Sequence, residues 1–237
     1  CPEASASISV TNNPIPTIPV ISDFGLCDNN LDGNDANGLV TFDLTQKNTE
    51  ISNLISGYAI TFHIDINEAI AGNNAINSIY SGNNIIYVRF TNTTNGCYFT
   101  ASFNLIVFPK PVINPIVTLK QCDIDTDANT TFNLTQANIL IATDSDLTFS
   151  YHNSLAGAEN NNDFVSNEIG FIASNGSIVW ARISNTNGCF RTSRVNLVVS
   201  ATTIPQTFRY TLDEVCDDYL SATDPDGDGI GYFNLTE

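Results

Sequence analysis

The sequence contains no methionine, one tryptophan and two histidines, and only 8 of its 237 residues are lysine or arginine. These 8 basic residues face 25 acidic ones, which gives a formal net charge of −17. Because nucleic-acid binding depends on a basic surface that neutralises phosphates, this charge excludes a nucleic-acid-binding protein. It also disfavours binding to anionic membranes. Since residue 1 is not methionine, we expect the chain to be a processed or internal segment of a longer protein.

Long apolar runs and catalytic motifs are missing as well. No stretch of about 18 apolar residues is present, so we expect no membrane-spanning helix. The GxSxG, HExxH and P-loop motifs are absent, and the cysteines lack the CxxC spacing of zinc sites. The two histidines, His63 and His152, occupy equivalent places in TFHID and FSYHN, where we expect them to point outward from a strand. Together these absences predict a protein that is not an enzyme.

The composition that remains is typical of an exported protein. Six cysteines occur together with abundant asparagine, threonine, serine and glycine and with very little lysine. Cysteines in such a background favour an oxidising compartment, so we expect an extracellular protein, either attached to the cell surface or secreted. A hydrophobic content of 42% is sufficient for a folded core.

The strongest feature of the sequence is internal repetition. The segment NIIYVRFTNTTNGCYFTASFNLIVF (84–108) aligns with SIVWARISNTNGCFRTSRVNLVV (177–199). Each reads as two alternating strands joined by a turn that ends in Asn-Gly, which predicts a β-hairpin. The alignment places three pairs of residues in equivalent positions: Tyr87 with Trp180, Arg89 with Arg182, and Cys97 with Cys189.

A second repeated signature consists of Cys-Asp, an acidic loop of variable length, and Phe-[Asp/Asn]-Leu-Thr. It occurs at 26–45, 121–135 and 215–236. The Cys-Asp cysteines are 95 and 94 residues apart, and Cys1, Cys97 and Cys189 are 96 and 92 apart. Proline-rich linkers are expected at 14–19, 109–115 and 201–206. We therefore expect the end of a preceding repeat (1–16), repeat 1 (17–110), repeat 2 (111–203) and the start of repeat 3 (204–237).

The hydrophobic pattern within a repeat has a period of two, with turn signals every 8–12 residues. For repeat 2 we expect strands near 112–121, 131–134 and 146–152, a helical turn at 136–142, an irregular Asn-rich stretch and the closing hairpin. This pattern predicts an all-β fold of tandem immunoglobulin-like β-sandwich repeats of about 92–96 residues, containing disulfides. Core positions are predicted for Tyr87 and Trp180 and for the phenylalanines of the second signature, Phe42, Phe132 and Phe233.

The six cysteines, Cys1, Cys27, Cys97, Cys122, Cys189 and Cys216, allow two regular pairing schemes. Pairing within repeats joins Cys27 to Cys97 and Cys122 to Cys189. It requires six strands in each repeat, because the end of the first strand and the start of the last strand are then expected at the same end of the sandwich. Pairing of sequence neighbours gives Cys1–Cys27, Cys97–Cys122 and Cys189–Cys216. The remaining alternative is a set of free buried thiols. A bridge would stabilise a unit by roughly 2–4 kcal/mol.

The acidic loops carry the residue types that bind calcium, which prefers oxygen ligands. The alternating candidates are Asp28, Asn30 and Asp32 in the first loop, Asp123, Asp125 and Asp127 in the second, and Asp224, Asp226 and Asp228 in the third. The twelfth positions that close an EF-hand with Glu are Leu39 and Leu235, so a true EF-hand is excluded. A structural Ca²⁺ site completed by Asp35, Asp43 or a backbone carbonyl is the prediction. The alternative is that Asp, Asn and Gly simply form turns here.

The combination CDxxxDG…F[DN]LT followed by YVRxxNTxxGC…FxLxV resembles the tandem repeats of very large surface proteins of flavobacteria and related Bacteroidota. The resemblance covers essentially the whole chain. Such proteins are typically exported by type IX secretion, and several are adhesins, including adhesins of gliding motility. The resemblance implies a non-catalytic adhesive stalk. Its partners would be further repeats of the same chain, the secretion and surface-anchoring machinery, and an external surface or polysaccharide.

Two other functions remain open from the sequence. One is a carbohydrate-binding or spacer module of a secreted polysaccharide-degrading protein, for which Trp180 and Tyr87 could supply a sugar-binding platform. The other is a subunit of a surface filament. An exposed row of aromatic side chains would favour the carbohydrate-binding module, whereas concentration-dependent fibres would favour the filament.

Overall fold

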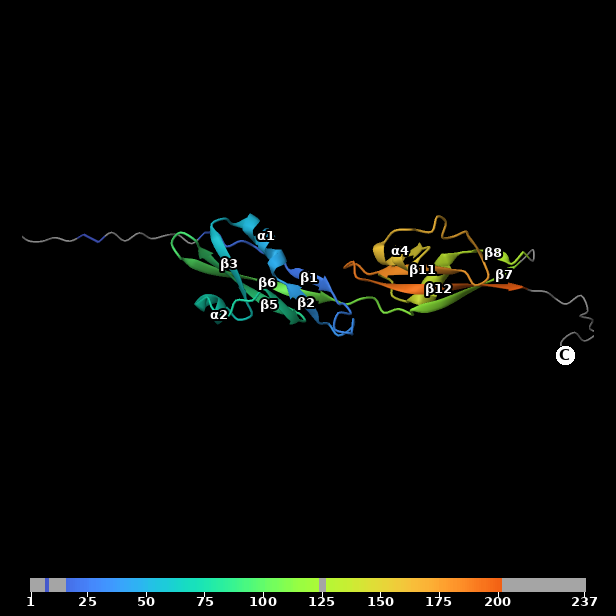
Figure 1. The fold of residues 1–237 in the computed structure, drawn as a ribbon, viewed down its shortest axis with the longest axis horizontal. Helices are drawn as coiled ribbons and strands as arrows, with labels where there is room; N and C mark the ends of the chain where they lie inside the picture. Colours follow the sequence, from blue (N-terminus) through green and yellow to red (C-terminus); the bar gives the residue numbers. More distant parts are fainter. Residues whose placement is uncertain (1–6, 9–15, 124–126, 202–237) are drawn as a thin grey trace, which may run out of the picture.

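The computed structural model describes residues 7–8, 16–123 and 127–201, which contain two tandem domains of the same design. Domain 1 contains β1 (Phe24–Cys27), β2 (Val40–Asp43), α1 (Thr45–Leu54), β3 (Tyr58–His63), α2 (Ile66–Ala71), β4 (Ser78–Ser81), β5 (Asn84–Asn92) and β6 (Tyr98–Phe108). Domain 2 contains β7 (Ile116–Asp123), β8 (Asn129–Phe132), the 3-10 helix η1 (Leu134–Ala137), α3 (Asn138–Ile141), β9 (Thr148–His152), α4 (Leu155–Asn160), β10 (Phe171–Ser174), β11 (Ile178–Ser184) and β12 (Phe190–Ala201). The domains follow one another along the long axis of the molecule (Figure 1).

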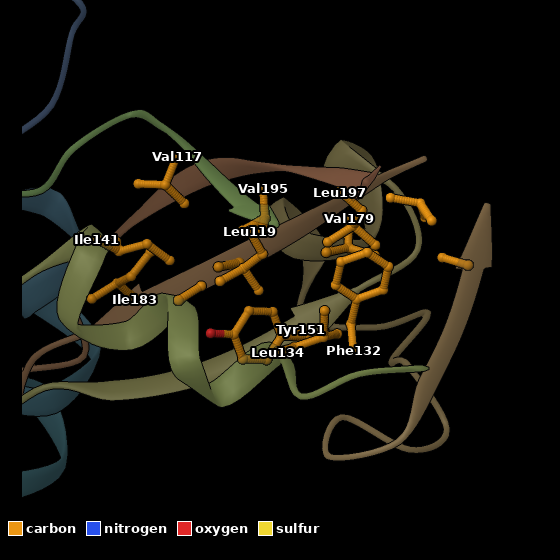
Figure 2. Close-up of a cluster of buried hydrophobic side chains, with 14 residues drawn as sticks. Val117, Leu119, Phe132, Leu134, Ile141, Tyr151, Val179, Ile183, Val195 and Leu197 are labelled. Atoms are coloured by element: carbon orange, nitrogen blue, oxygen red, sulfur yellow. The ribbon is translucent and has the colours of Figure 1, made fainter. Parts of the chain in front are cut away.

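Each domain is an immunoglobulin-like β-sandwich, as the sequence pattern predicts. In domain 1 the sheet β1-β6-β5-β3 packs against the pair β2-β4, and in domain 2 the sheet β7-β12-β11-β9 packs against β10-β8. The inner faces form two separate hydrophobic cores. Figure 2 shows how the side chains of β7, β11 and β12 meet Phe132 of β8 in domain 2. Phe42 and Phe132 are buried, which confirms them as core anchors, while Phe233 lies outside the described residues.

The first and last strands of each domain lie side by side and run in the same direction. In domain 1, β1 pairs with β6 in parallel from Phe24↔Leu105 to Cys27↔Phe108. In domain 2, β7 pairs with β12 in parallel from Ile116↔Arg194 to Asp123↔Ala201. We call the end of a domain where these two strands finish its C-terminal pole. The opposite end, where the closing hairpin turns, is its N-terminal pole.

The expected elements of repeat 2 are present with small shifts in their ends, and η1 and α3 provide the predicted helical turn. The Asn-rich stretch is not irregular throughout, because it contains α4 and β10. Helix α4 begins where the Ser154 hydroxyl accepts a hydrogen bond from the Gly157 N–H. Among the described residues, no helix is long and apolar enough to cross a membrane.

A short helix covers the outer face of each four-stranded sheet. Helix α2 contacts β3 and β5, and α4 contacts β9 and β11. The equivalent arginines of the closing hairpins hold these helices: Arg89 Nη1 donates to the Ala69 carbonyl at 2.8 Å, and Arg182 Nη1 to the Ala158 carbonyl at 2.8 Å. The Arg182 guanidinium also stacks on the Phe190 ring, 3.3 Å from its centroid. A cation at the carbonyl end of a helix is favourable.

This helical layer changes the environment of residues that the pattern places on the outer face. His63 and His152 do point away from the core, but they are fully buried rather than exposed. His152 Nδ1 lies 2.6 Å from the Asn162 carbonyl oxygen in the chain that follows α4. The core positions predicted for Tyr87 and Trp180 are wrong. Their neighbours along the strands fill the cores, so alternation leaves both rings half-buried on the outer face.

The arginine contact gives a prediction for the stability of each domain. Arg182→Met removes the bonds to the Ala158 and Glu159 carbonyls, so domain 2 should lose roughly 1.5–3 kcal/mol of unfolding free energy. Fluorescence of Trp180, the single tryptophan, in a urea titration reports domain 2 alone. The equivalent change Arg89→Met should leave the Trp180 transition in place and lower the stability of domain 1. An unchanged transition in Arg182→Met would contradict this role.

Candidate functional site: the junction between the domains

The C-terminal pole of domain 1 meets the N-terminal pole of domain 2, and we call this region the junction. It comprises Cys27, the acidic loop 28–39, the linker 109–115, the β11–β12 turn 185–188, Cys189 and Arg191. Cys27 reaches the junction because it is the last residue of β1 and pairs with Phe108, the last residue of β6. The Asp28 N–H extends the pairing by one step, donating to the Phe108 carbonyl at 2.9 Å.

The β11–β12 turn presents Cys189 from the other side. Its Asn185 side chain accepts hydrogen bonds from the N–H groups of Asn187 at 3.1 Å and Cys189 at 3.0 Å. Gly188 has a φ of 79°, a left-handed conformation that glycine adopts without steric cost. The same Asn185 side chain donates to the Pro109 carbonyl in the linker at 2.9 Å. The Asn-x-Asn-Gly-Cys turn therefore both orients Cys189 and contacts the linker at the point where it leaves domain 1.

A disulfide joins Cys27 of domain 1 to Cys189 of domain 2. The Cα atoms are 5.5 Å apart, a normal spacing for a bridge, and the two cysteines are separated by 162 positions in the sequence. Cys189 is fully buried. In the chain-entropy account, closing a loop of this length stabilises the folded state by about 5 kcal/mol. The two domains are therefore connected twice at the junction, by the polypeptide linker and by the disulfide.

This bridge contradicts every pairing predicted for its two cysteines, namely Cys27–Cys97, Cys122–Cys189, Cys1–Cys27 and Cys189–Cys216. The reason is the parallel pairing of the first and last strands. It puts Cys27 at the C-terminal pole and Cys97, which precedes β6, at the opposite pole of the same domain. Six strands per domain therefore do not bring these two cysteines together, although that strand number was the condition for pairing within repeats.

The predicted pair Cys97–Cys122 is also wrong, because both cysteines are free and exposed. Cys97 lies at the N-terminal pole of domain 1 and Cys122 near the end of β7, at the C-terminal pole of domain 2. They therefore occupy the two poles that face away from the junction. Cys1 and Cys216 lie outside the described residues.

Asp35 connects the two domains electrostatically, a role that the sequence reading missed. Its carboxylate accepts from Arg191 Nη2 of domain 2 at 2.8 Å and from Lys110 Nζ of the linker at 3.3 Å. All three side chains are partly buried, and such pairs contribute on the order of 1 kcal/mol each. The sequence does contain a feature that points to this role, because Asp35 lies in the additional residues that make the first acidic loop longer than the second. Both partners come from the scarce basic residues.

The junction is otherwise open. A cavity of about 560 Å³ lies beside the linker and is lined by Asp35, Lys110, Ile113, Pro115, Glu159, Phe190, Arg191 and Thr192. A second hollow of about 400 Å³ lies against Pro109, Pro111 and residues 144–147. The two hydrophobic cores are not continuous across the junction. A few point contacts and one covalent bond therefore hold the domains in their relative positions.

The aspartates of the Cys-Asp motifs fasten their own loops. Asp28 is 1% exposed, and its Oδ2 accepts from the Gly38 N–H at 2.7 Å. In domain 2, Asp123 Oδ2 accepts from the Ala128 N–H at 2.8 Å. Gly38 and Ala128 both have a left-handed backbone, with φ of 71° and 64°. Each buried aspartate thus closes its acidic loop onto a residue of the same unusual conformation.

Asp32, at the tip of the first loop, is bound by neighbours on the same domain. Its Oδ1 accepts from the Asn34 N–H at 2.9 Å, and its Oδ2 accepts from the Asn37 amide at 2.6 Å and from the Tyr80 hydroxyl. The Tyr80 hydrogen bond, with the Asn37 and Asn34 bonds behind it, lowers the pKa of Asp32 from 3.8 to about 2. Asn30 contributes its backbone carbonyl to a turn closed by the Gly33 N–H at 3.2 Å.

These hydrogen bonds occupy oxygens that the calcium prediction assigned to a metal. Asp127 likewise accepts from the Asn129 N–H at 2.7 Å. Within residues 7–8, 16–123 and 127–201, no group of three or more His, Cys, Asp or Glu side chains is placed to hold a metal ion. Asp125, Asp224, Asp226 and Asp228 lie outside the described residues. Calcium binding by these loops stays a prediction.

The left-handed backbone of the acidic loops predicts opposite effects for two reciprocal substitutions. Ala128→Gly should stabilise domain 2 by up to about 1 kcal/mol. Glycine removes the steric cost of the left-handed φ in the folded state, and this gain in free energy is larger than the loss that comes from the greater conformational entropy of glycine in the unfolded chain. Gly38→Ala should destabilise domain 1 by a similar amount, and its Cβ would meet no atom within 4 Å. Calorimetric unfolding measures both. Shifts of the same sign would contradict the backbone explanation.

The Tyr80 contact predicts a pH dependence. Because the folded-state pKa of Asp32 is below its ordinary value, this carboxylate stabilises the fold above about pH 4, and the contribution is lost as the pH falls toward 2. Tyr80→Phe should raise the pKa of Asp32 toward 3.8, as measured by NMR titration of its carboxyl carbon. Tyr98→Phe, at the opposite pole, serves as the control. An unchanged Asp32 midpoint in Tyr80→Phe would show that the hydroxyl has no such effect.

Several solved structures are distantly similar to this chain. Extracellular domains 3–5 of Drosophila OTK are 12% identical, over 76% of this chain and 59% of theirs, with a TM-score of 0.32. The four N-terminal immunoglobulin domains of Dscam1 isoform 4.44 are 11% identical, over 49% of this chain and 34% of theirs, with a TM-score of 0.22. The endo-fucoidan hydrolase MfFcnA4 of glycoside hydrolase family 107 is 14% identical, over 52% of this chain and 19% of its own, with a TM-score of 0.21. The chain spans less than two thirds of the length of each of these structures. The assignment of the fold is based on the strand pairings of the chain itself.

No match to the sequence was found among curated proteins. A family model does match, twice in tandem. The model of the Flavobacterium inter-domain disulphide bond domain covers residues 23–111 and again 118–205. The first match spans β1 to β6 and the second most of β7 and all strands to β12, and the bridge between Cys27 and Cys189 is the kind of bond that the family description names. The chain therefore belongs to the Flavobacterium inter-domain disulphide bond domain family.

Proposed function

We propose that the chain is a non-catalytic, extracellular spacer in which successive domains are fastened end to end by disulfides. The observation that carries this proposal is the bridge from Cys27 in domain 1 to Cys189 in domain 2. Structural disulfides persist in oxidising compartments, which supports a location outside the cytoplasm. The rest of the junction consists of ion pairs and hollows, so the bridge is its principal fastening.

The two free cysteines extend this arrangement. Cys97 occupies the place in domain 1 that Cys189 occupies in domain 2, and Cys122 occupies the place of Cys27. Both are exposed at poles that face away from the junction. We infer that Cys97 bonds to the Cys-Asp cysteine of a preceding repeat, and Cys122 to the Asn-Gly-Cys cysteine of a following repeat. Further repeats of the same chain are then the immediate partners.

The wider role that fits such an array is the stalk of a large cell-surface adhesin. The repeat motifs resemble those of flavobacterial adhesins exported by type IX secretion, and the family assignment supports the same bacterial group. Attachment to an external surface or polysaccharide, including attachment during gliding, belongs to this proposal. The surface-anchoring machinery would hold the array at the cell.

The described surface favours a spacer over a carbohydrate-binding module. Sugar-binding platforms need exposed aromatic rings in a row. Trp180 and Tyr87 are half-buried beside the helical layer. The exposed Tyr80 and Tyr98 lie at opposite poles of domain 1, and Phe164 lies in domain 2. Within the part of the chain that the structure describes, the exposed aromatic side chains are therefore dispersed.

Peptide mapping of the full-length protein under non-reducing conditions tests the proposal. We expect three kinds of linked peptide: Cys27 with Cys189, Cys97 with a Cys-Asp peptide, and Cys122 with an Asn-Gly-Cys peptide. Antibodies against this segment should label intact cells without permeabilisation, and deletion of the repeats should reduce attachment of the cells to a surface.

Free thiols at Cys97 and Cys122 in the full-length protein would contradict the covalent array. Labelling only of permeabilised cells would contradict the extracellular location. Specific glycan binding by this segment alone would favour the carbohydrate-binding module, and fibres that grow with protein concentration would favour the filament subunit.

A further inference from the structure

The direction of the terminal strands determines how a pull along the molecule is transmitted. The chain enters domain 1 at the start of β1 and leaves domain 2 at the end of β12. Both strands run toward the C-terminal pole of their own domain, since β1 is parallel to β6 and β12 is parallel to β7. The domains follow one another along one axis, so β1 and β12 both lie in the general direction of a pull between the ends (Figure 1).

The disulfide connects these two strands at the ends that face the junction. Cys27 is the last residue of β1, and Cys189 directly precedes Phe190, the first residue of β12. A covalent route therefore runs from β1 through the two sulfur atoms into β12. The polypeptide between the cysteines, residues 28–188, forms a closed loop beside this route. It contains every other strand and every helix of the two domains.

We propose that the Cys27–Cys189 bridge makes β1 and β12 one continuous covalent tension line, which keeps the bodies of both domains out of the path of a pulling force. The physiological load rests on the proposed function as a surface stalk. The mechanical property itself is a property of this chain alone.

The two strands of the tension line, β1 and β12, cannot lengthen appreciably when they are pulled. A β-strand already rises about 3.3 Å per residue, close to the limit of roughly 3.3–3.6 Å for a fully extended chain. The 162-position separation between the cysteines, in contrast, corresponds to roughly 550 Å of extended chain. As long as the bridge is intact, none of this length can be drawn out, even if the domains inside the loop unfold.

Without the bridge the same pull passes through the linker. It then shears β1 from β6 across four residue pairs and β7 from β12 across eight. Each backbone hydrogen bond has a net value of only about 0.5–1.5 kcal/mol. The ion pairs of Asp35 with Lys110 and Arg191 lie beside the linker, but they are partly exposed and contribute little more. The bridge therefore decides whether tension reaches the hydrogen bonds of the sandwiches.

In an array, the same geometry produces two tension lines. The first strand of each domain bonds to the last strand of the next, and that strand continues through its linker into the first strand of the domain after it. A second line, offset by one domain, would begin with Cys122 in β7. Within each domain the two lines are the parallel terminal strands, joined by their hydrogen bonds. This extension requires the bridges inferred for Cys97 and Cys122.

Single-molecule force spectroscopy of the 237-residue chain, held at its two ends, tests the tension line. Under oxidising conditions we expect no domain-sized unfolding step while the bridge is intact. The double variant Cys27→Ser/Cys189→Ser should show two such steps, which together release roughly 550 Å more than the oxidised chain. Adding a thiol reductant to the oxidised chain under constant force should make the same length available.

The variant Cys97→Ser/Cys122→Ser is the matched control, since it removes two cysteines that lie off this line, and it should behave like the parent chain. Trp180 fluorescence establishes that domain 2 is folded in each variant before it is pulled. Two domain-sized steps in the oxidised parent chain would overturn the tension line. That result would leave the surface location and the array unaffected, whereas failure of the cell-labelling experiment would not alter the force measurement.

Discussion

The parallel pairing of the first and last strands in each sandwich is the constraint on which the rest of the molecule depends. It gives every domain two different poles, with the Cys-Asp cysteine at one and the Asn-Gly-Cys turn at the other. Two cysteines of one domain are therefore kept apart, while cysteines of successive domains are brought together. The bridge between Cys27 and Cys189 follows from this arrangement. So does the continuous route from β1 to β12.

The acidic residues act mainly on the loops and on the junction. Asp28 and Asp123 are buried and close the loops that follow the Cys-Asp motifs. Asp35 engages Lys110 and Arg191, and thereby uses two of the few basic residues at the place where the domains meet. Since the junction also contains open hollows, these polar contacts guide the relative position of the domains, and the disulfide prevents their separation.

Several residues of the repeated hairpin motif, including its arginine and the aromatic residue after its cysteine, take part in one packing arrangement. Arg89 and Arg182 each hold the carbonyl end of a short helix and stack on the aromatic residue that follows the hairpin cysteine. The helix in turn covers a buried histidine on the outer face of the sheet. The motif therefore describes a packed third layer next to the cysteine turn.

The sequence by itself determined the repeat, the all-β sandwich, the closing hairpins and the core role of Phe42 and Phe132, because these depend on local alternation, turn residues and burial of large side chains. Only the tertiary structure decided which cysteines pair. Sequence spacing does not reveal whether the terminal strands run parallel, and that direction places Cys27 beside Cys189 instead of Cys97. It also decided that His63 and His152 are buried and that Trp180 faces outward. Strand alternation indicates which face a residue occupies, but not which helix packs over that face.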